Sequence, residues 1–173
     1  MKNILKFLFF FSFIILNQQI LKADTYYLDF KFIIDQSVAG KKTNQALKNE
    51  LDQGVKKLKT KEQELQKKEK EIIQQKKLLS PEEYKKKISS LREEVTSLQK
   101  ERNKVIQSIS TKRNNARKKL LDELNPIVKS YMIEKDIKLI LDKKSVLLGD
   151  EKLDITKDIL EILNKNLKSI KLN

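Results

Sequence analysis

The sequence has no cysteine, no histidine and no tryptophan among its 173 residues. Without cysteine the chain forms no disulfide and offers no thiol nucleophile or thiolate metal ligand. Without histidine it also lacks Ser-His and Cys-His catalytic pairs and imidazole metal sites, so only carboxylates, lysines and hydroxyl groups remain for chemistry. The composition therefore argues against an enzyme, and we expect no catalytic residue, no cofactor and no bound metal.

Glycine, proline and aromatic residues are also scarce. The chain has three Gly and two Pro, which leaves no Gly-rich loop to cradle phosphates. Five of its seven Phe fall within the first thirteen residues, so little aromatic bulk remains for a core. With 39% hydrophobic and 36% charged residues, we expect one modest compact domain at most.

The N-terminal 23 residues have the composition of a secretory signal peptide. Lys2 and Lys6 precede an apolar run from Phe7 to Leu16, and Ala23 provides a small residue for cleavage. The run is about half of the roughly 20 apolar residues that span a bilayer, which disfavours the alternative of an uncleaved anchor. Since no cysteine follows it, a thioether lipid anchor is excluded. We expect an exported protein that begins at Asp24.

Positive charge is concentrated in the middle of the chain. The whole sequence has a net charge of +14, and removing residues 1–23 leaves 35 Lys and Arg against 24 Asp and Glu, or +11. Residues 41–125 contain 24 Lys and Arg against 13 Asp and Glu, also +11. The flanking segments are therefore balanced, as expected of a small folded body that carries a basic appendage.

Residues 42–125 are predicted to form that appendage as two helices. An ascending row of apolar residues recurs every seven positions, which is typical of one side of a coiled-coil seam. The descending half has a fuller pattern. The ascending row is Leu51, Leu58, Leu65, Ile72 and Leu79, and the descending rows are Leu91, Leu98 and Val105 with Ile88, Val95, Ile109 and Ala116.

A helix start signal separates the two halves. Ser80 can cap a new helix, Pro81 suits its first position, and Glu83 completes a capping box three residues after the cap. We therefore expect an antiparallel hairpin with its tip near residues 79–82, rather than the alternative of one kinked helix. The ascending helix, from about Thr43 to Leu79, would be on the order of 55 Å long. Asn125-Pro126 predicts a kink or break near the base of the descending helix.

The segments 24–41 and 126–173 are predicted to form one discontinuous β-rich body. Alternating residues indicate strands at Tyr26–Ile34, Ile137–Asp142 and Ser145–Leu148. Thr156 is predicted to cap a final helix with one apolar face. That face comprises Ile155, Ile159, Ile162, Leu163, Leu167 and Ile170. The fold class is α+β and mostly α, with the helical arm inserted between strands of a small sheet. Because so small a body has a small core, we expect oligomerisation.

Nearly the whole mature sequence resembles the Skp/OmpH family of periplasmic chaperones. The stretch "LDFKFIIDQSVAGKKTNQALKNEL" is similar to the family's opening strand and first helix, and "LLSPEEYKKK" to its hairpin region. The segment "IKLILDKKSVLL...LDITKDILEILN" is similar to its closing strands and final helix. Asp154, Ile155, Thr156 and Asn164 follow the family's pattern there, which is the most specific element of the resemblance.

The resemblance implies a homotrimer with a barrel-like hub and three arms around a cavity. In that cavity the family holds unfolded outer-membrane β-barrel proteins without ATP and without catalytic residues. The implied client contacts are the apolar row and distal lysines of the arm, namely Leu58, Leu65, Ile72, Leu79, Lys85, Lys86 and Lys87. The positive charge also suits anionic lipid or lipopolysaccharide, although the basic patch of some family members has no alignable motif here.

Two other functions fit a basic helical protein. A non-catalytic coiled-coil spacer of the cell envelope would need no cavity and would not suppress aggregation. A nucleic-acid-binding protein could neutralise phosphates with the same lysines. The signal peptide, the preference for Lys over Arg and the absence of an aromatic platform along the arm argue against nucleic acid as a physiological partner.

Overall fold

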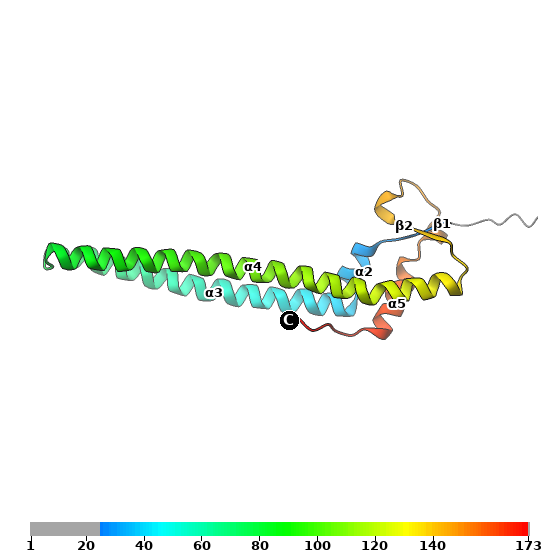
Figure 1. Cartoon of the computed structure of the whole chain (residues 1–173), viewed down its shortest axis with the longest axis horizontal. Helices are drawn as coiled ribbons and strands as arrows, with labels where there is room; N and C mark the ends of the chain where they lie inside the picture. The colour runs from blue at the N-terminus through cyan, green and yellow to red at the C-terminus, as the bar shows by residue number, and fades with distance from the viewer. Residues whose placement is uncertain (1–24, 173) are drawn as a thin grey trace, which may run out of the picture.

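A computed structural model describes residues 25–172, in which a long helical arm projects from a small body (Figure 1). The predicted signal peptide lies outside the described residues. The chain is mostly helical with a small sheet, as the sequence predicts. The elements in chain order are β1 (Thr25–Leu28), α2 (Phe30–Gln36), α3 (Val38–Gln75), α4 (Pro81–Glu134), β2 (Leu139–Asp142), 3-10 turns at Lys143–Ser145 (η1) and Glu151–Leu153 (η2), and α5 (Thr156–Asn166).

Helices α3 and α4 lie side by side along the arm (Figure 1). Ion pairs join Lys61 to Glu101 and Lys68 to Glu94, so residue numbers rise along one helix as they fall along the other. The two helices therefore run in opposite directions. At 1.5 Å per residue, the 38 residues of α3 span about 57 Å. Helix α4 is longer, and its last turns continue beyond the start of α3 into the body.

The turn between the two helices follows the predicted capping chemistry. The Ser80 hydroxyl accepts a hydrogen bond from the Glu83 amide at 3.2 Å, and the Ser80 amide donates to the Glu83 carboxylate at 3.0 Å. Pro81 is the first residue of α4, where its missing N–H costs nothing. The predicted capping box is therefore confirmed. Helix α3 ends at Gln75, four residues before the predicted Leu79.

The break that Asn125-Pro126 predicted does not occur. Helix α4 continues without interruption through Pro126 to Glu134. Leu124 and Val128, on either side of the proline, are both buried in the body core. Packing on this face stabilises the helical path where local preference alone would end it, because tertiary contacts commonly outweigh propensity.

The sheet has two parallel strands rather than three. Strand β1 pairs with β2 in the register Thr25↔Leu139 to Leu28↔Asp142, and a single bridge joins Tyr27 to Asp154 on the other side of β1. The arm is the crossover between the two strands, which places the described segments before and after it in one body. The sheet is open, so the predicted barrel-like hub is not confirmed.

Two strand predictions were wrong in part or whole. The first strand ends at Leu28 because the Asp29 carboxylate accepts a hydrogen bond from the Phe32 amide at 2.8 Å and starts helix α2. The predicted strand Ser145–Leu148 is absent from the described body. A 3-10 turn ends at Ser145, and Leu147 and Leu148 are 94% and 90% exposed.

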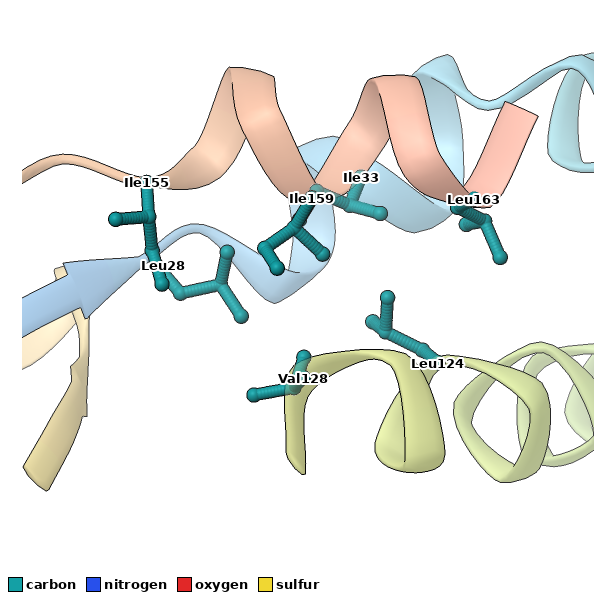
Figure 2. Packing of buried hydrophobic residues seen from close by; sticks show 7 residues of the cluster. All are labelled: Leu28, Ile33, Leu124, Val128, Ile155, Ile159 and Leu163. Atoms are coloured by element: carbon teal, nitrogen blue, oxygen red, sulfur yellow. The ribbon is translucent and has the colours of Figure 1, made fainter. Parts of the chain in front are cut away.

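The body core lies between α5 and α4, with α2 and the end of β1 completing it (Figure 2). The final helix packs its apolar face mainly on α2 and α4, so it covers helices more than the sheet. A second small cluster at the root of the arm joins Ile34, Ala39 and Leu120, against which Ile170 packs. The main cluster comprises Leu28, Ile33, Leu124, Val128, Ile155, Ile159 and Leu163.

Candidate functional site

The predicted apolar row of α3 forms the seam between the helices. Leu58 and Ile72 are buried there, and Leu65 and Leu79 are partly buried. Leu98 and Ile109 of α4 are buried from the opposite side. These side chains stabilise the arm, and in this conformation little of their surface faces solvent. The structure therefore separates the residues that build the arm from those that a partner could touch.

The predicted distal lysines begin helix α4 just after the tip. Lys85, Lys86 and Lys87 are all exposed. The Lys87 ammonium donates a hydrogen bond to the Gln75 side chain at 2.9 Å and so links the two helices. Lys85 and Lys86 make no side-chain ion pair among the described residues. They leave positive charge at the far end of the arm.

One long side of the arm is closed by polar contacts. Two ion pairs there have N–O distances of 2.6 Å each, between Lys61 and Glu101 and between Lys68 and Glu94. The Lys87–Gln75 hydrogen bond continues the row toward the tip. We define the ion-paired face as Lys61, Lys68 and Gln75 of α3 with Lys87, Glu94 and Glu101 of α4.

The opposite side of the arm holds a groove of about 750 Å³. Its floor is the apolar seam, including Leu65, Leu91 and Leu98, and Val95 stands more than half exposed at its edge. The one ion pair that crosses it, between Arg102 and Glu62, is long at 3.4 Å. We define the open face as Glu62, Gln66 and Glu69 of α3 with Val95, Gln99 and Arg102 of α4.

The sequence reasoning did not single out this open face. It assigned Val95 to the seam, but Val95 lines the groove together with Glu69 and is more than half exposed. Ile73 and Ile106, which are apolar residues just outside the predicted seam rows, were a signal in the sequence. Val55, Ile73, Val95 and Ile106 are each more than half exposed.

A second hollow of about 380 Å³ lies at the root of the arm, between α2, α3 and α4. Its rim is basic, with Lys31, Arg113 and Arg117, and its floor includes Ile34 and Leu120. The Lys31 ammonium lies 2.6 Å from the Asp35 carboxylate, and this hydrogen bond and charge raise the pKa of Lys31. The two arginines are one helical turn apart and project from the same side of α4.

The body motif Asp154, Thr156 and Asn164 joins distant parts of the chain. The Asp29 amide donates to the Thr156 hydroxyl at 3.0 Å, and the Val38 amide donates to the Asn164 side-chain oxygen at 2.7 Å. The first bond reaches the start of α2, and the second satisfies a free amide at the start of α3. Thr156 therefore links the final helix to the start of α2, and Asn164 fastens it to the root of the arm.

The predicted cap, Thr156, is instead the first residue of α5, and Ile155 occupies the N-cap position without a side-chain cap hydrogen bond. The Asp154 carboxylate accepts a hydrogen bond from the Thr156 amide at 3.0 Å and also bonds the Thr156 hydroxyl. The Lys143 ammonium lies 2.6 Å from its other oxygen. Burial raises the pKa of Asp154, but the hydrogen bonds from Lys143 and Thr156 outweigh it and hold the pKa below its ordinary value. The motif is structural in every contact that it makes.

Within residues 25–172 no cluster of three or more carboxylates has the arrangement of a metal site. In the same range no helix combines the length and apolar character needed to cross a membrane.

The family model described as "Outer membrane protein (OmpH-like)" matches residues 24–163. Among solved structures, an OmpH-like protein of Caulobacter crescentus, described as a candidate outer membrane chaperone, superposes with a TM-score of 0.81. It is 17% identical in sequence, and the match covers 86% of this chain and 88% of that one. Both share the fold described above. The sequence has no significant match among curated proteins.

Proposed function

The chain belongs to the OmpH-like family, and from that premise we propose that it is an ATP-independent periplasmic holding chaperone for unfolded outer-membrane proteins. The solved relative in Caulobacter crescentus carries a chaperone description, which agrees with this function. The proposal includes export through a cleaved signal peptide and clients held in a cavity between basic helical arms.

One observation carries the proposal. The arm spans about 57 Å, and outside the body its two helices pack only against each other. Along that length the arm exposes both apolar side chains and excess lysine. An unfolded β-barrel protein exposes apolar residues and unpaired strand edges that aggregate. A long surface of scattered apolar and basic contacts would bind such a chain weakly at many points. Binding of that kind is reversible, so release would need no nucleotide.

We further propose that three copies assemble through their bodies. Strand β2 pairs only with β1 among the described strands, which leaves its outer edge available for pairing. Leu139 and Leu141 on this strand, and Leu147 and Leu148 after it, are exposed apolar side chains. Burial of these leucines between copies would supply the apolar core that one body lacks. Light scattering on the protein as it elutes from a sizing column would measure the assembly directly.

Anionic lipid or lipopolysaccharide is a second proposed partner. The hollow at the root of the arm combines an apolar floor with Arg113 and Arg117, whose guanidinium groups suit phosphate or carboxylate. Binding to vesicles that contain anionic lipid, compared with neutral vesicles, would test this partner.

The test of the holding function is aggregation of a client. A urea-unfolded outer-membrane β-barrel protein is diluted into buffer with the chain that begins at Asp24, and light scattering is followed as protomer is added. We expect scattering to fall and to saturate near three protomers per client. High salt should weaken but not abolish this effect, because charge assists apolar contact. Unchanged scattering would favour the structural spacer, in which the arm separates envelope parts without binding clients.

A further inference from the structure

The two long sides of the arm differ in chemistry, and we infer that the open face is the side that contacts unfolded clients. The expected occupant is an extended polypeptide segment that presents apolar side chains on alternate residues. This inference rests on the proposed holding function and adds to it the face, and therefore the residues, that the client touches.

Exposed apolar residues gather on this one side. Val95 lines the groove directly. Ile73 and Ile106 lie seven residues after Gln66 and Gln99, so two helical turns bring them to the same side of the arm. Val55 precedes Glu62 by the same interval. Apart from Leu78 in the tip turn, these four are the large hydrophobic side chains that are most exposed in the described arm between residues 38 and 117.

The ion-paired face has the opposite character. Two hollows lie along it, and their apolar lining residues, such as Ile72 and Leu98, belong to the buried seam. A client would have to compete with the Lys61–Glu101 and Lys68–Glu94 pairs to reach them. Because the Lys61 and Lys68 ammonium groups each have a carboxylate at 2.6 Å, an apolar client would meet paired charges along most of this face.

The polar residues of the groove indicate which kind of chain fits it. Gln66 and Gln99 carry amides and Thr96 a hydroxyl, all at the groove. The Thr96 hydroxyl already donates to the Arg92 carbonyl oxygen at 2.8 Å, so it can only accept, whereas the two amides can donate to and accept from the unpaired backbone of an extended segment. A strand of a barrel protein alternates apolar and polar side chains, so its apolar side could lie on Val95 and the seam beneath. Its backbone would then face the amides.

Other occupants fit the groove less well. A third helix, including the arm of another copy, would need a continuous apolar stripe for a coiled-coil contact. Glu62, Arg102 and Glu69 interrupt the stripe. A lipid chain would leave the same charged groups without water or partners, which is costly. An unfolded polypeptide can place its own polar side chains at these points.

The absence of cysteine makes the inference directly testable by labelling single sites. Val95→Cys places a thiol on the open face. Ser97→Cys, a nearly isosteric change two residues away, places one beside the ion-paired face. Each variant carries a photoactivatable crosslinker on its thiol and is mixed with a urea-unfolded outer-membrane β-barrel protein. We expect several times more client crosslinked from position 95 than from position 97.

A second pair of variants measures affinity. The double variant Val95→Gln with Ile106→Gln replaces two apolar side chains of the open face with glutamine, which is a good helix former. The control variant Ser90→Gln with Ser97→Gln introduces the same residue at two positions beside the ion-paired face. We expect the first double variant to bind the client about tenfold more weakly, and the second to bind like the parent.

The outcomes separate the two proposals. If the parent does not suppress client scattering, the holding function fails. If the parent suppresses scattering but positions 95 and 97 crosslink equally, or position 97 crosslinks more, the function stands and the open-face inference is wrong. Crosslinking from position 95 mainly to another copy, with or without client, would also overturn it and assign the groove to arm packing.

Discussion

The two glycines within α3 offer matched substitutions with different expected outcomes. An added Cβ atom at Gly40 would lie 1.7 Å from the backbone carbonyl oxygen of Ile34 and 2.9 Å from the Ser37 hydroxyl oxygen. Backbone cannot rotate aside as a side chain can, so α2 and α3 would have to separate. At Gly54 the nearest atom is a methyl carbon of Val105, 2.8 Å away on a partly buried side chain.

The magnitudes follow from these neighbours. Replacing glycine with alanine inside a helix stabilises by roughly 0.5–1 kcal/mol. At Gly54 this gain offsets a small overpacking cost of about 1 kcal/mol, so we expect a net change within about 1 kcal/mol. At Gly40 the shift of Ile34 would also disturb its packing on Ala39 and Leu120. We therefore expect Gly40→Ala to lower the free energy of unfolding by at least about 3 kcal/mol.

Urea unfolding of the parent and both variants would measure the difference. Far-ultraviolet circular dichroism reports the helices, and tyrosine fluorescence reports mainly the body, which contains Tyr26, Tyr27 and Tyr131. All samples need one protomer concentration, because the stability of an oligomer depends on it. Equal free energies of unfolding for Gly40→Ala and the parent would refute the close approach of α2 and α3.

Three further predictions concern the caps and the body motif. Ser80→Ala should cost about 1 kcal/mol and speed hydrogen exchange at the tip, including the Glu83 amide; unchanged exchange would contradict the cap. Asn164→Ala should lower the free energy of unfolding by about 1–2 kcal/mol through the unpaired Val38 amide, whereas Asn164→Asp keeps an acceptor and should lose less. Because the pKa of Asp154 is lowered in the folded state, its contribution to stability is present above the ordinary carboxyl pKa and is lost as pH falls through the folded value. Asp154→Asn should therefore show a smaller fall in urea midpoint than the parent between about pH 5 and pH 2, and equal falls would contradict the assignment.

The tip of the arm could be predicted from sequence because its determinants are local. Ser80, Pro81 and Glu83 act within four consecutive residues, and the structure shows the capping box that their types and spacing predict. Strand β2 lies within the predicted segment Ile137–Asp142, although it begins at Leu139. Where adjacent residues decide the conformation, pattern and structure agree.

The body was harder to predict because distant contacts decide it. Alternation through Tyr26–Ile34 resembles a strand, yet the strand ends at Leu28 and helix α2 begins at Phe30, where Ile33 and Ile34 are both buried. The sequence pattern did not identify Asp29 as the N-cap of helix α2. Pro126 shows the reverse case, in which local chemistry predicts a break and packing around Leu124 overrides it.

The functional difference between the two sides of the arm depends on how α3 and α4 are aligned with each other, which the heptad pattern of either helix does not specify. Each helix has polar flanks on both sides of its apolar row, so either flank could pair across the seam. The relative position of the two helices decides it: Lys61 pairs with Glu101 and Lys68 with Glu94 on one side, while Glu69 and Val95 both line the groove on the other. Two short ion pairs therefore close one side, whereas the other has the single longer pair between Arg102 and Glu62 and remains open.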